Sequence, residues 1–217
     1  MKKNQLGDIL NFYKDLGVEY LNIKLKKINE TQKNVEVELE KLKKAVENCK
    51  ACELYKTKKR YVFGDGNPYA SLMFIGEAPG ASEDEQGKPF VGRAGQLLNE
   101  LLKEIGIARK DVYIANCLKC RPPNNRDPFD YELKACRPFL DRQIELIKPK
   151  VIITLGRFAL MQILGNDKKI TQTRGLVFDK KTYSVIPTYH PAYLLRNPKA
   201  IEIFLNDLKT AKHYMGV

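Results

Sequence analysis

Five cysteines are the residues of this 217-residue sequence whose type and spacing most clearly indicate chemistry. Cys49 and Cys52 form one Cys-x2-Cys pair, and Cys117 and Cys120 form another, a spacing typical of zinc ribbons. The fifth, Cys136, follows Cys120 with 15 residues between them. In a reducing compartment, such cysteines bind metal more often than they form disulfides. We therefore expect a metal site, and thiolate ligands by themselves suit zinc and iron–sulfur clusters equally.

Glu77, Asn116 and His190 are further candidates, because each ends or follows a short apolar segment predicted to be a strand. In open α/β sheets, ligands bind beyond the carboxyl ends of the strands. A turn rich in Gly and Pro, or a lone His, is by itself a weak indication of a site. Because three such residues are expected at one edge of a sheet, we predict a ligand-binding site there.

The elements expected to position these residues alternate between strand and helix. The predicted strands cover residues 71–75, 112–117, 151–155 and 184–187. The predicted helices cover residues 94–105, 131–147, 157–164 and 200–214, and Pro138 is expected to bend the second of them. Strands separated by such helices predict parallel pairing with helices on both faces. The expected fold class is therefore α/β, a three-layer α/β/α architecture with a central, mainly parallel four-stranded sheet.

The first 48 residues are expected to form a helical extension, apart from a main domain over residues 49–217. A short amphipathic helix that ends near Gly17 is predicted from Leu6, Ile9, Leu10 and Tyr13. The apolar positions of a second helix recur every three or four residues, at Val35, Leu39, Leu42, Val46 and Cys49. Such a stripe packs against a main domain more often than it binds a coiled-coil partner.

The sequence carries a formal net charge of +12, and residues 1–48 contribute only +2 of it, with ten Lys against eight Asp or Glu. Excess positive charge attracts nucleic acids, although a lysine-rich solvated surface is the other common reason for it. No apolar run approaches the ~20 residues that span a bilayer, and no signal-peptide pattern opens the sequence. We therefore expect a cytoplasmic protein without a membrane partner, and a monomer.

Four segments resemble motifs of the family 4 uracil-DNA glycosylases, the iron–sulfur-containing type, in the same order along the chain. They are GEAPG at 76–80, GKPFVGRAG at 87–95, LKCRPP at 118–123 and HPAYLL at 190–195. The resemblance covers roughly residues 49–210, nearly the whole of that family's domain. It implies that the chain hydrolyses the N-glycosidic bond of uracil in DNA, which releases uracil and leaves an abasic site in base-excision repair. The implied partner is uracil-containing DNA, either single- or double-stranded.

The resemblance implies that uracil is bound by Gly76, Glu77, Ala78, Phe90, Asn116 and His190. A glycosylase holds the extruded base on an aromatic ring and reads its Watson–Crick edge, roles that suit Phe90 and Asn116. The Asn116 amide offers one acceptor and one donor, which match uracil N3–H and O4 and mismatch cytosine.

The implied catalytic residues are Glu77, Glu83 and His190. Departing uracil carries negative charge, which a donor from His190 would stabilise as an oxyanion hole does. A carboxylate can favour the positive sugar and orient water, and Glu77 and Glu83 are the two candidates for this role. We expect Glu77 to lie near the base, and the alternative for Glu83 is to exclude the methyl group of thymine. Better-known uracil glycosylases of the related fold have an Asp at the position of Ala78, so water activation departs from their pattern here.

The resemblance assigns a [4Fe–4S] cluster to Cys49, Cys52, Cys120 and Cys136, in place of the zinc-ribbon set. In this assignment Cys117 belongs to a strand and points away from Asn116, because strand residues alternate between faces. We expect the cluster to be structural, because hydrolysis needs no electrons.

Leu194, Leu195 and Arg196 are expected to form a wedge that fills the stack left by the extruded base, with Arg196 near the DNA backbone. The alternative is that Leu194 and Leu195 pack inside the domain. Two other functions stay open at this point. One is a glycosylase for hypoxanthine or xanthine, and the other is a non-catalytic iron–sulfur module that binds DNA.

Overall fold

The structure, a computed structural model of the chain, describes residues 34–216. The short helix predicted to end near Gly17 therefore lies outside the described residues. The chain divides into two compact units, Met1–Glu40 and Lys41–Val217. A helix covers residues 34–47 and crosses this division. The boundary expected at residue 48 coincides with the end of this helix and stays an expectation.

Six strands form one sheet in the second unit, in the order β1-β3-β2-β4-β6-β5. They are β1 (Asp65–Gly66), β2 (Leu72–Gly76), β3 (Tyr113–Asn116), β4 (Val151–Leu155), β5 (Phe178–Lys180) and β6 (Tyr183–Thr188). The central strands β3, β2, β4 and β6 pair in parallel, while β1 and β5 add antiparallel edges. The four predicted strands are thus confirmed, but the sheet has six. The two edge strands are too short to show an alternating pattern in the sequence.

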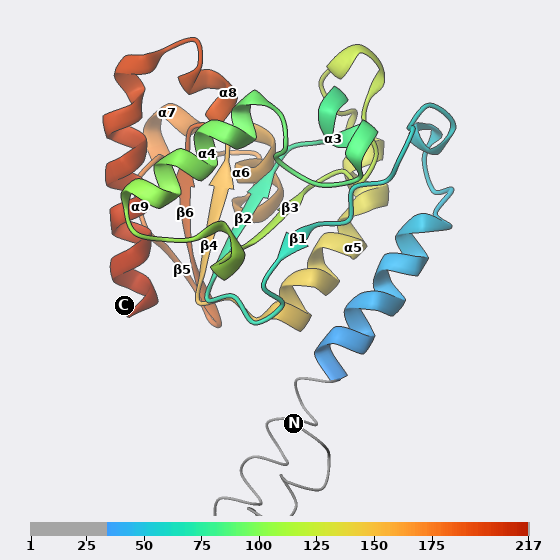
Figure 1. Ribbon diagram of the computed structural model, residues 1–217, viewed down its shortest axis with the longest axis horizontal. Coiled ribbons are helices and arrows are strands. Elements are labelled where there is room, and N and C mark those ends of the chain that lie inside the picture. The colour runs from blue at the N-terminus through green and yellow to red at the C-terminus, as the bar shows by residue number, and fades with distance from the viewer. Residues whose placement is uncertain (1–33, 217) are drawn as a thin grey trace, which may run out of the picture. The chain divides into compact units, whose positions relative to one another are not determined.

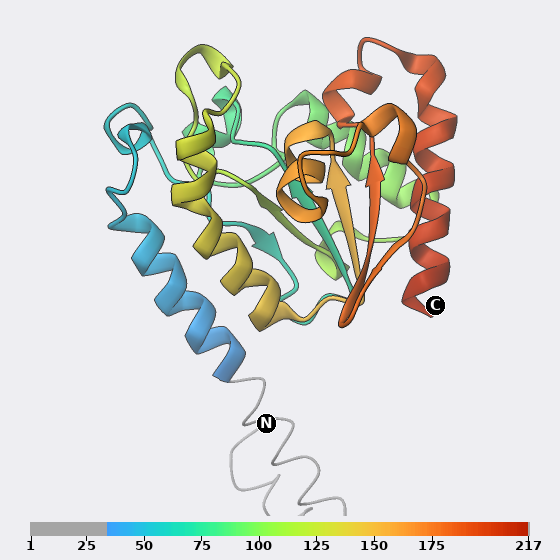
Figure 2. The same cartoon turned by 180° about the vertical axis from the view of Figure 1, so that it is seen from behind.

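Helices cover both faces of this sheet. The α-helices of the second unit are α3 (Ala81–Gln86), α4 (Arg93–Glu104), α5 (Asp130–Ile147), α6 (Arg157–Leu164), α7 (Ile170–Thr173), α8 (Pro191–Leu194) and α9 (Ile201–Met215). Single 3-10 turns are η1 (Glu53–Lys56), η2 (Arg109–Asp111), η3 (Pro123–Asn125) and η4 (Pro198–Ala200). Helices α4 and α9 lie on the near face in Figure 1, and α5 and α6 lie on the opposite face, seen in Figure 2. The three-layer α/β/α fold is therefore confirmed.

The main hydrophobic core lies between the sheet and helices α4 and α9. Phe74, Ile114, Ile153 and Ile186 contribute to it from the four parallel strands, and Phe204 contributes from α9. Every residue of β2 and β4 is buried, because helices cover both faces of the sheet at these strands. This burial explains why their sequences are uninterrupted apolar runs rather than alternating ones.

Helix α5 is continuous from Asp130 to Ile147 although it contains Pro138. Among the described residues, no helix combines the length and apolar character needed to cross a membrane.

The parallel strands β2, β4 and β6 all point toward the same edge of the sheet (Figure 1). The loops that follow β2, β3 and β6 therefore meet at that edge, where the sequence predicts the site.

Candidate active site

A cleft at the carboxyl ends of the strands collects most of the polar residues that the sequence singles out. Gly76 of β2 pairs with Asn116 of β3, so the two strands end at the same level. Strand β6 ends at Thr188, whose hydroxyl donates to Asp207 of α9 at 2.6 Å, and His190 follows two residues later. The cleft has a volume of about 550 Å³, and its lining includes Glu77, Ala78, Glu83, Phe90, Asn116 and His190.

Gly76 contributes to this cleft by having no side chain. A Cβ at this position would lie 2.3 Å from Asn116 Oδ1 and 2.8 Å from Phe90 Cε2. Both separations are shorter than carbon atoms tolerate, so only glycine lets the amide and the ring approach the end of β2. The role expected for Gly76 in base binding is thus to leave room for its neighbours.

Asn116 presents an unsatisfied hydrogen-bond acceptor in the cleft. The residue is only 2% exposed, and its Oδ1 has no hydrogen-bond partner in the structure. A buried acceptor without a partner costs roughly 1–3 kcal/mol, so such atoms are retained where a ligand or water satisfies them. A planar base with an N–H beside a carbonyl would satisfy Oδ1 and accept from the amide nitrogen at once.

A buried lysine that the sequence analysis did not single out holds the main chain of Asn116. Lys119 is 1% exposed, and its ammonium donates to the Asn116 carbonyl at 2.8 Å and to Gln143 Oε1 at 2.6 Å. Gln143 of α5 donates in turn to the Phe63 carbonyl at 2.9 Å. This network ties the end of β3 to α5. Its only signal in the sequence is a lysine directly after the apolar run at the end of the strand, where an exposed turn is the ordinary expectation.

His190 is held as a neutral hydrogen-bond donor. It caps the N-terminus of α8, where its Nδ1 accepts from the Ala192 N–H at 3.1 Å. In a neutral imidazole this leaves the proton on Nε2, which is the donor. Burial lowers the pKa of His190 to about 4, and Arg196 adds to this effect while Glu83 opposes it. The side chain therefore offers an N–H near neutral pH without carrying a positive charge.

Phe90 is fixed beside His190 in a strained backbone conformation. The two ring centroids are 5.5 Å apart, with the rings tilted by 35°. The φ of Phe90 is +54°, a left-handed value that costs on the order of 1–3 kcal/mol outside glycine. Arg109 donates to the neighbouring Pro89 carbonyl at 2.7 Å. Gly95 packs so closely that a Cβ there would lie 1.9 Å from the Phe90 carbonyl oxygen. These contacts keep the ring at the cleft.

Glu83 holds the other side of the same loop. Its Oε1 accepts from the N–H groups of Val91 and Gly92, at 3.1 and 3.0 Å. One carboxylate oxygen is thus already engaged with the backbone that follows Phe90. Although Glu83 also lines the cleft, this geometry supports a positioning role for the ring more directly than a catalytic one.

Glu77 is a carboxyl group of the cleft whose pKa is raised well above its usual value. Burial raises the pKa of Glu77 to about 7, with repulsion from Asp127 adding to the rise and Arg157 opposing it. Asp127 and Arg157 also form an ion pair with each other. Carboxyl groups with pKa values near neutrality are typical of residues that act in acid–base or electrostatic catalysis.

Comparison with known proteins identifies the family to which this chain belongs. The model of the uracil DNA glycosylase superfamily matches residues 63–211. The chain belongs to this superfamily. A type-4 uracil-DNA glycosylase of Sulfurisphaera tokodaii is 48% identical over 79% of this chain and 82% of the relative. Type-4 relatives from Archaeoglobus fulgidus and Thermotoga maritima are 46% and 48% identical, each over 82% of this chain and 94% of the relative.

The three residues expected to act as a wedge at the rim of the glycosylase cleft differ in their exposure to solvent. Leu194 is fully buried and belongs to the main hydrophobic core, so it is unavailable to DNA. Leu195 is 44% exposed, and Arg196 lines the cleft. Leu194 is the last residue of α8 and Leu195 is its C-cap, still in helical conformation. Consecutive side chains of a helical turn point in different directions, which explains why one leucine packs inward and the next faces solvent.

Four of the five cysteines of this family member line one small apolar cavity: Cys49, Cys52, Cys120 and Cys136. Cys117 is buried but does not line it. Burial raises the pKa of Cys120 to about 12 and that of Cys136 to about 11, and repulsion from the other thiolates adds to both rises. In the described part of the chain, no three metal-binding side chains converge on one point. The four thiols line one common cavity, and four thiolates can hold either zinc or an iron–sulfur cluster.

Proposed function

We propose that this chain hydrolyses the N-glycosidic bond of uracil in DNA, releasing uracil and leaving an abasic site for base-excision repair. The buried, unpartnered Oδ1 of Asn116 carries this proposal. Uracil presents N3–H next to O4, so it satisfies this acceptor and accepts from the amide nitrogen, whereas cytosine presents the reverse pattern. The type-4 names of the relatives support the same activity. We further propose that the chain acts as a monomer in the cytoplasm.

The reaction needs stabilisation of two opposite charges, and the cleft offers a group for each. Bond cleavage leaves negative charge on uracil, toward which the neutral Nε2–H of His190 can donate. Positive charge develops on the sugar, and an ionised Glu77 would favour it and orient water. Phe90, held between the contacts of Glu83 and Arg109, supplies the surface on which the extruded base stacks.

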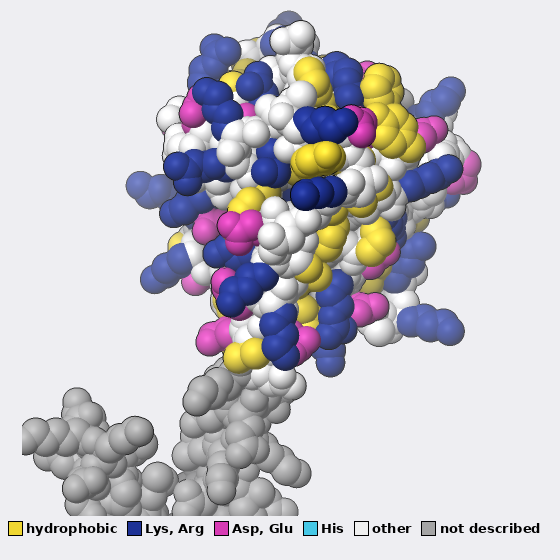
Figure 3. All heavy atoms as spheres, turned by 90° about the vertical axis from the view of Figure 1, so that its right-hand side faces the viewer, with side chains coloured by type: hydrophobic (Ala, Val, Ile, Leu, Met, Phe, Trp, Pro, Cys, Tyr) yellow, Lys and Arg dark blue, Asp and Glu magenta, His cyan; other side chains and the backbone are white. Residues whose placement is uncertain are grey.

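Basic charge assists the encounter with DNA over a wide surface. The chain carries a formal net charge of +12. On the face seen in Figure 3, Lys and Arg side chains are spread broadly, with fewer acidic side chains between them. Phosphate contacts of this kind supply most of the affinity of sequence-independent DNA binding and weaken steeply with salt. Base identity is then read in the cleft.

We propose a [4Fe–4S] cluster as the group held by Cys49, Cys52, Cys120 and Cys136. Their common apolar cavity supports this set. When bound, such a cluster supplies structural cross-links between segments far apart in the sequence. Here the cysteines would tie the residues after the helix at 34–47 to the loop after β3 and to α5. Asn116 lies four residues before Cys120, so this anchoring would also steady the residue that reads the base.

The activity is tested with oligonucleotides that contain uracil, hypoxanthine or xanthine, followed by alkali to cleave abasic sites. We expect cleavage of the uracil strand only. Asn116→Asp should weaken cleavage of uracil, because the carboxylate cannot donate to O4, and it should admit some cytosine through acceptance from its N4 amine. Cleavage of hypoxanthine or xanthine at rates like those of uracil would contradict the assigned base. DNA binding without cleavage of any strand would identify a non-catalytic module.

The rate should depend on pH through Glu77. Its pKa of about 7 makes the carboxyl mostly neutral below that pH and ionised above it, so the single-turnover rate is expected to rise as pH increases through 7. The charged groups that face it are Asp127 and Arg157, and the cleft also holds Glu83, Arg126, His190 and Arg196. His190, with a pKa of about 4, stays neutral over this range.

Glu77→Gln is the variant that tests this assignment, because it should be slow and should lose the rise with pH. A second measurement does not need activity. Since folding raises the pKa of Glu77, its ionisation disfavours the folded state as pH rises above the unfolded value of 4.5. Glu77→Gln should therefore raise the melting temperature at pH 8 more than at pH 5. An unchanged pH profile in this variant would assign the titration to another group.

Leu195 is the residue we propose as the DNA wedge, with Arg196 beside the backbone. An apolar side chain inserted between bases offsets part of the few kcal/mol that unstacking costs. Leu195→Ala should therefore slow excision from duplex DNA more than excision from single strands. Leu176, which is 54% exposed, provides a matched exposed leucine as a control. Equal losses on both substrates, or a lowered melting temperature, would instead indicate a packing role for Leu195.

A further inference from the structure

Two exposed aromatic side chains beside the cleft have no role in the steps above. Phe129 precedes α5 and Tyr131 lies in its first turn, and they are 49% and 51% exposed. Their ring centroids are 5.8 Å apart, with an interplanar angle of 25°. Two neighbouring aromatic rings left exposed do not contribute the stabilising free energy that burial of their apolar area would give. Such pairs, when rimmed by polar residues, commonly mark binding surfaces.

Arg126 adds a third planar group to this pair by stacking on the Phe129 ring. Its guanidinium carbon lies 3.8 Å from the centroid of the Phe129 ring. The side chain of Arg126 is 30% exposed. Stacked guanidinium and aromatic planes attract each other, and both also stack on nucleobases. We call Arg126, Phe129 and Tyr131 the aromatic platform.

A buried carboxylate makes the platform rigid. Glu132 is 0% exposed and accepts from Arg126 Nη1 at 2.9 Å and from Nη2 at 2.6 Å. The same carboxylate accepts from the N–H of Phe129 at 2.8 Å. One side chain thus orients both the guanidinium and the backbone that carries the first ring. A surface held in one conformation before binding loses less conformational entropy when a ligand stacks on it.

The platform is continuous with the cleft proposed to hold uracil. Arg126 belongs to both, because it lines the cleft together with Pro122 and Asn125. Arg121, which donates to Asn125 Oδ1 at 2.8 Å, adds a second positive charge in the same loop. A nucleotide in the cleft has neighbours on its own strand within a few ångströms. The base next to it would therefore meet aromatic surface and positive charge together.

We propose that the aromatic platform stacks an unpaired base adjacent to uracil on the same DNA strand. The proposal rests on uracil DNA being the substrate of the cleft. Stacking on aromatic side chains tolerates any base, because every base has a π-face. The platform would therefore add affinity without adding sequence preference. It would also favour substrates whose flanking bases are already unstacked, such as single strands.

The test is a thermodynamic cycle between one base and one ring, measured by binding. Single-stranded oligonucleotides carry a non-cleavable 2′-fluoro-deoxyuridine, and each flanking base in turn is replaced by an abasic spacer. For the wild type, replacing the base at one flanking position should raise Kd by about 5- to 150-fold, the range expected for one lost base–aromatic stack. With an intact oligonucleotide, Phe129→Ala or Tyr131→Ala should raise Kd by a similar factor. With the abasic spacer at that flanking position, the same variant should raise Kd little further, because the stack is already lost.

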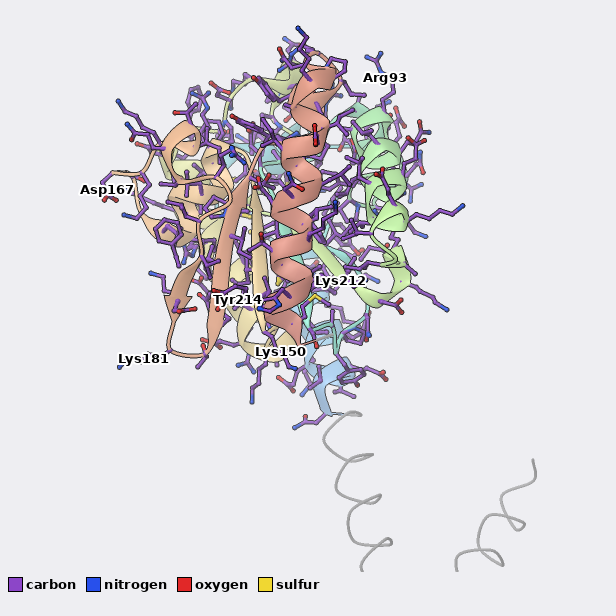
Figure 4. All side chains as sticks on the ribbon, turned by 90° about the vertical axis from the view of Figure 1, so that its left-hand side faces the viewer. Arg93, Lys150, Asp167, Lys181, Lys212 and Tyr214 are labelled. Carbon is purple, nitrogen blue, oxygen red and sulfur yellow. The ribbon has the colours of Figure 1, made fainter. Side chains whose placement is uncertain are left out.

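Matched variants separate stacking from general effects. Phe129→Leu keeps apolar bulk without a π-face and should behave like Phe129→Ala, whereas Phe129→Trp should retain the coupling. Tyr214 is a comparable exposed tyrosine at 46%, and Tyr214→Ala should leave Kd unchanged. It lies near the C-terminal end of α9, far from the labelled Arg93 at the start of α4 (Figure 4). Both platform rings are half exposed, so their variants should keep the melting temperature of the wild type.

The platform is overturned if the ring variants and the spacers raise Kd additively at every flanking position, or if no spacer raises Kd at all. This holds even if both rings bind some other partner. This outcome differs from failure of the proposed function. If the chain does not excise uracil, wild-type protein leaves uracil oligonucleotides intact. If only the platform is wrong, the wild type excises uracil normally but shows no coupling between a flanking base and either ring.

Discussion

In the His190→Ala variant, the single-turnover rate of uracil excision is expected to fall by about 10²–10³-fold, the usual loss when one donor to a developing anion is removed. The Nδ1 atom of His190 already accepts from the Ala192 N–H, so Nε2–H is the donor that the variant loses. DNA affinity should change little, because affinity comes mainly from phosphate contacts. Single-turnover assays are required, because product release can hide chemistry in the steady state.

The loss should be equally large at every pH from about 6 to 8, because burial holds the pKa of His190 at about 4 and its protonation state does not change in this range. His213, an exposed residue of α9, is the matched control, and His213→Ala should excise uracil at the wild-type rate. A His190→Ala protein with wild-type single-turnover kinetics would remove the leaving-group role assigned here.

Replacing Cys136 by Ser should abolish the iron content of protein purified without oxygen, together with its brown colour. The wild type is expected to carry about four irons per chain if a [4Fe–4S] cluster is present. Cys136 lines the cavity shared with Cys49, Cys52 and Cys120, so its loss leaves three ligands. The variant should also melt at a lower temperature, because the link from α5 to residues 49–52 is lost.

Cys117→Ser is the informative counterpart, because Cys117 is buried but does not line the cavity. It should keep the iron, the colour and the fold. The opposite pattern, with iron lost in Cys117→Ser and kept in Cys136→Ser, would assign the ligands to the two Cys-x2-Cys pairs. Stoichiometric zinc with no iron in the wild type would reject the cluster while leaving the ligand set open.

Much of the cleft was predictable because its residues are encoded next to strand ends. Glu77, Asn116 and His190 each end or follow an apolar segment, and parallel strands bring such ends to one edge of a sheet. The strands themselves were predictable because both faces are covered, which requires continuous apolar runs. The edge strands β1 and β5 were missed, since two or three residues carry no periodic signal.

The roles of individual side chains depended on partners far away in the sequence. Glu83 suits a catalytic carboxylate by its type, but its hydrogen bonds to Val91 and Gly92 reveal that it supports the Phe90 loop. Lys119 reads as an exposed residue of a turn, yet it is buried against Gln143, which lies 24 positions later. No local sequence pattern predicts the contact between Lys119 and Gln143, because it forms only when α5 packs beside the end of β3.

The sequence by itself determined the fold class, the strand ends that form the cleft and, through its four motifs, the glycosylase family. Only the tertiary structure decided which neighbours of these motifs face the cleft, the core or solvent. Leu194 and Leu195 are identical in chemistry and adjacent in the chain, but one is fully buried and the other is 44% exposed. The difference arises because Leu194 ends α8 and Leu195 caps it in helical conformation, so their side chains point in different directions and the core is present on only one side.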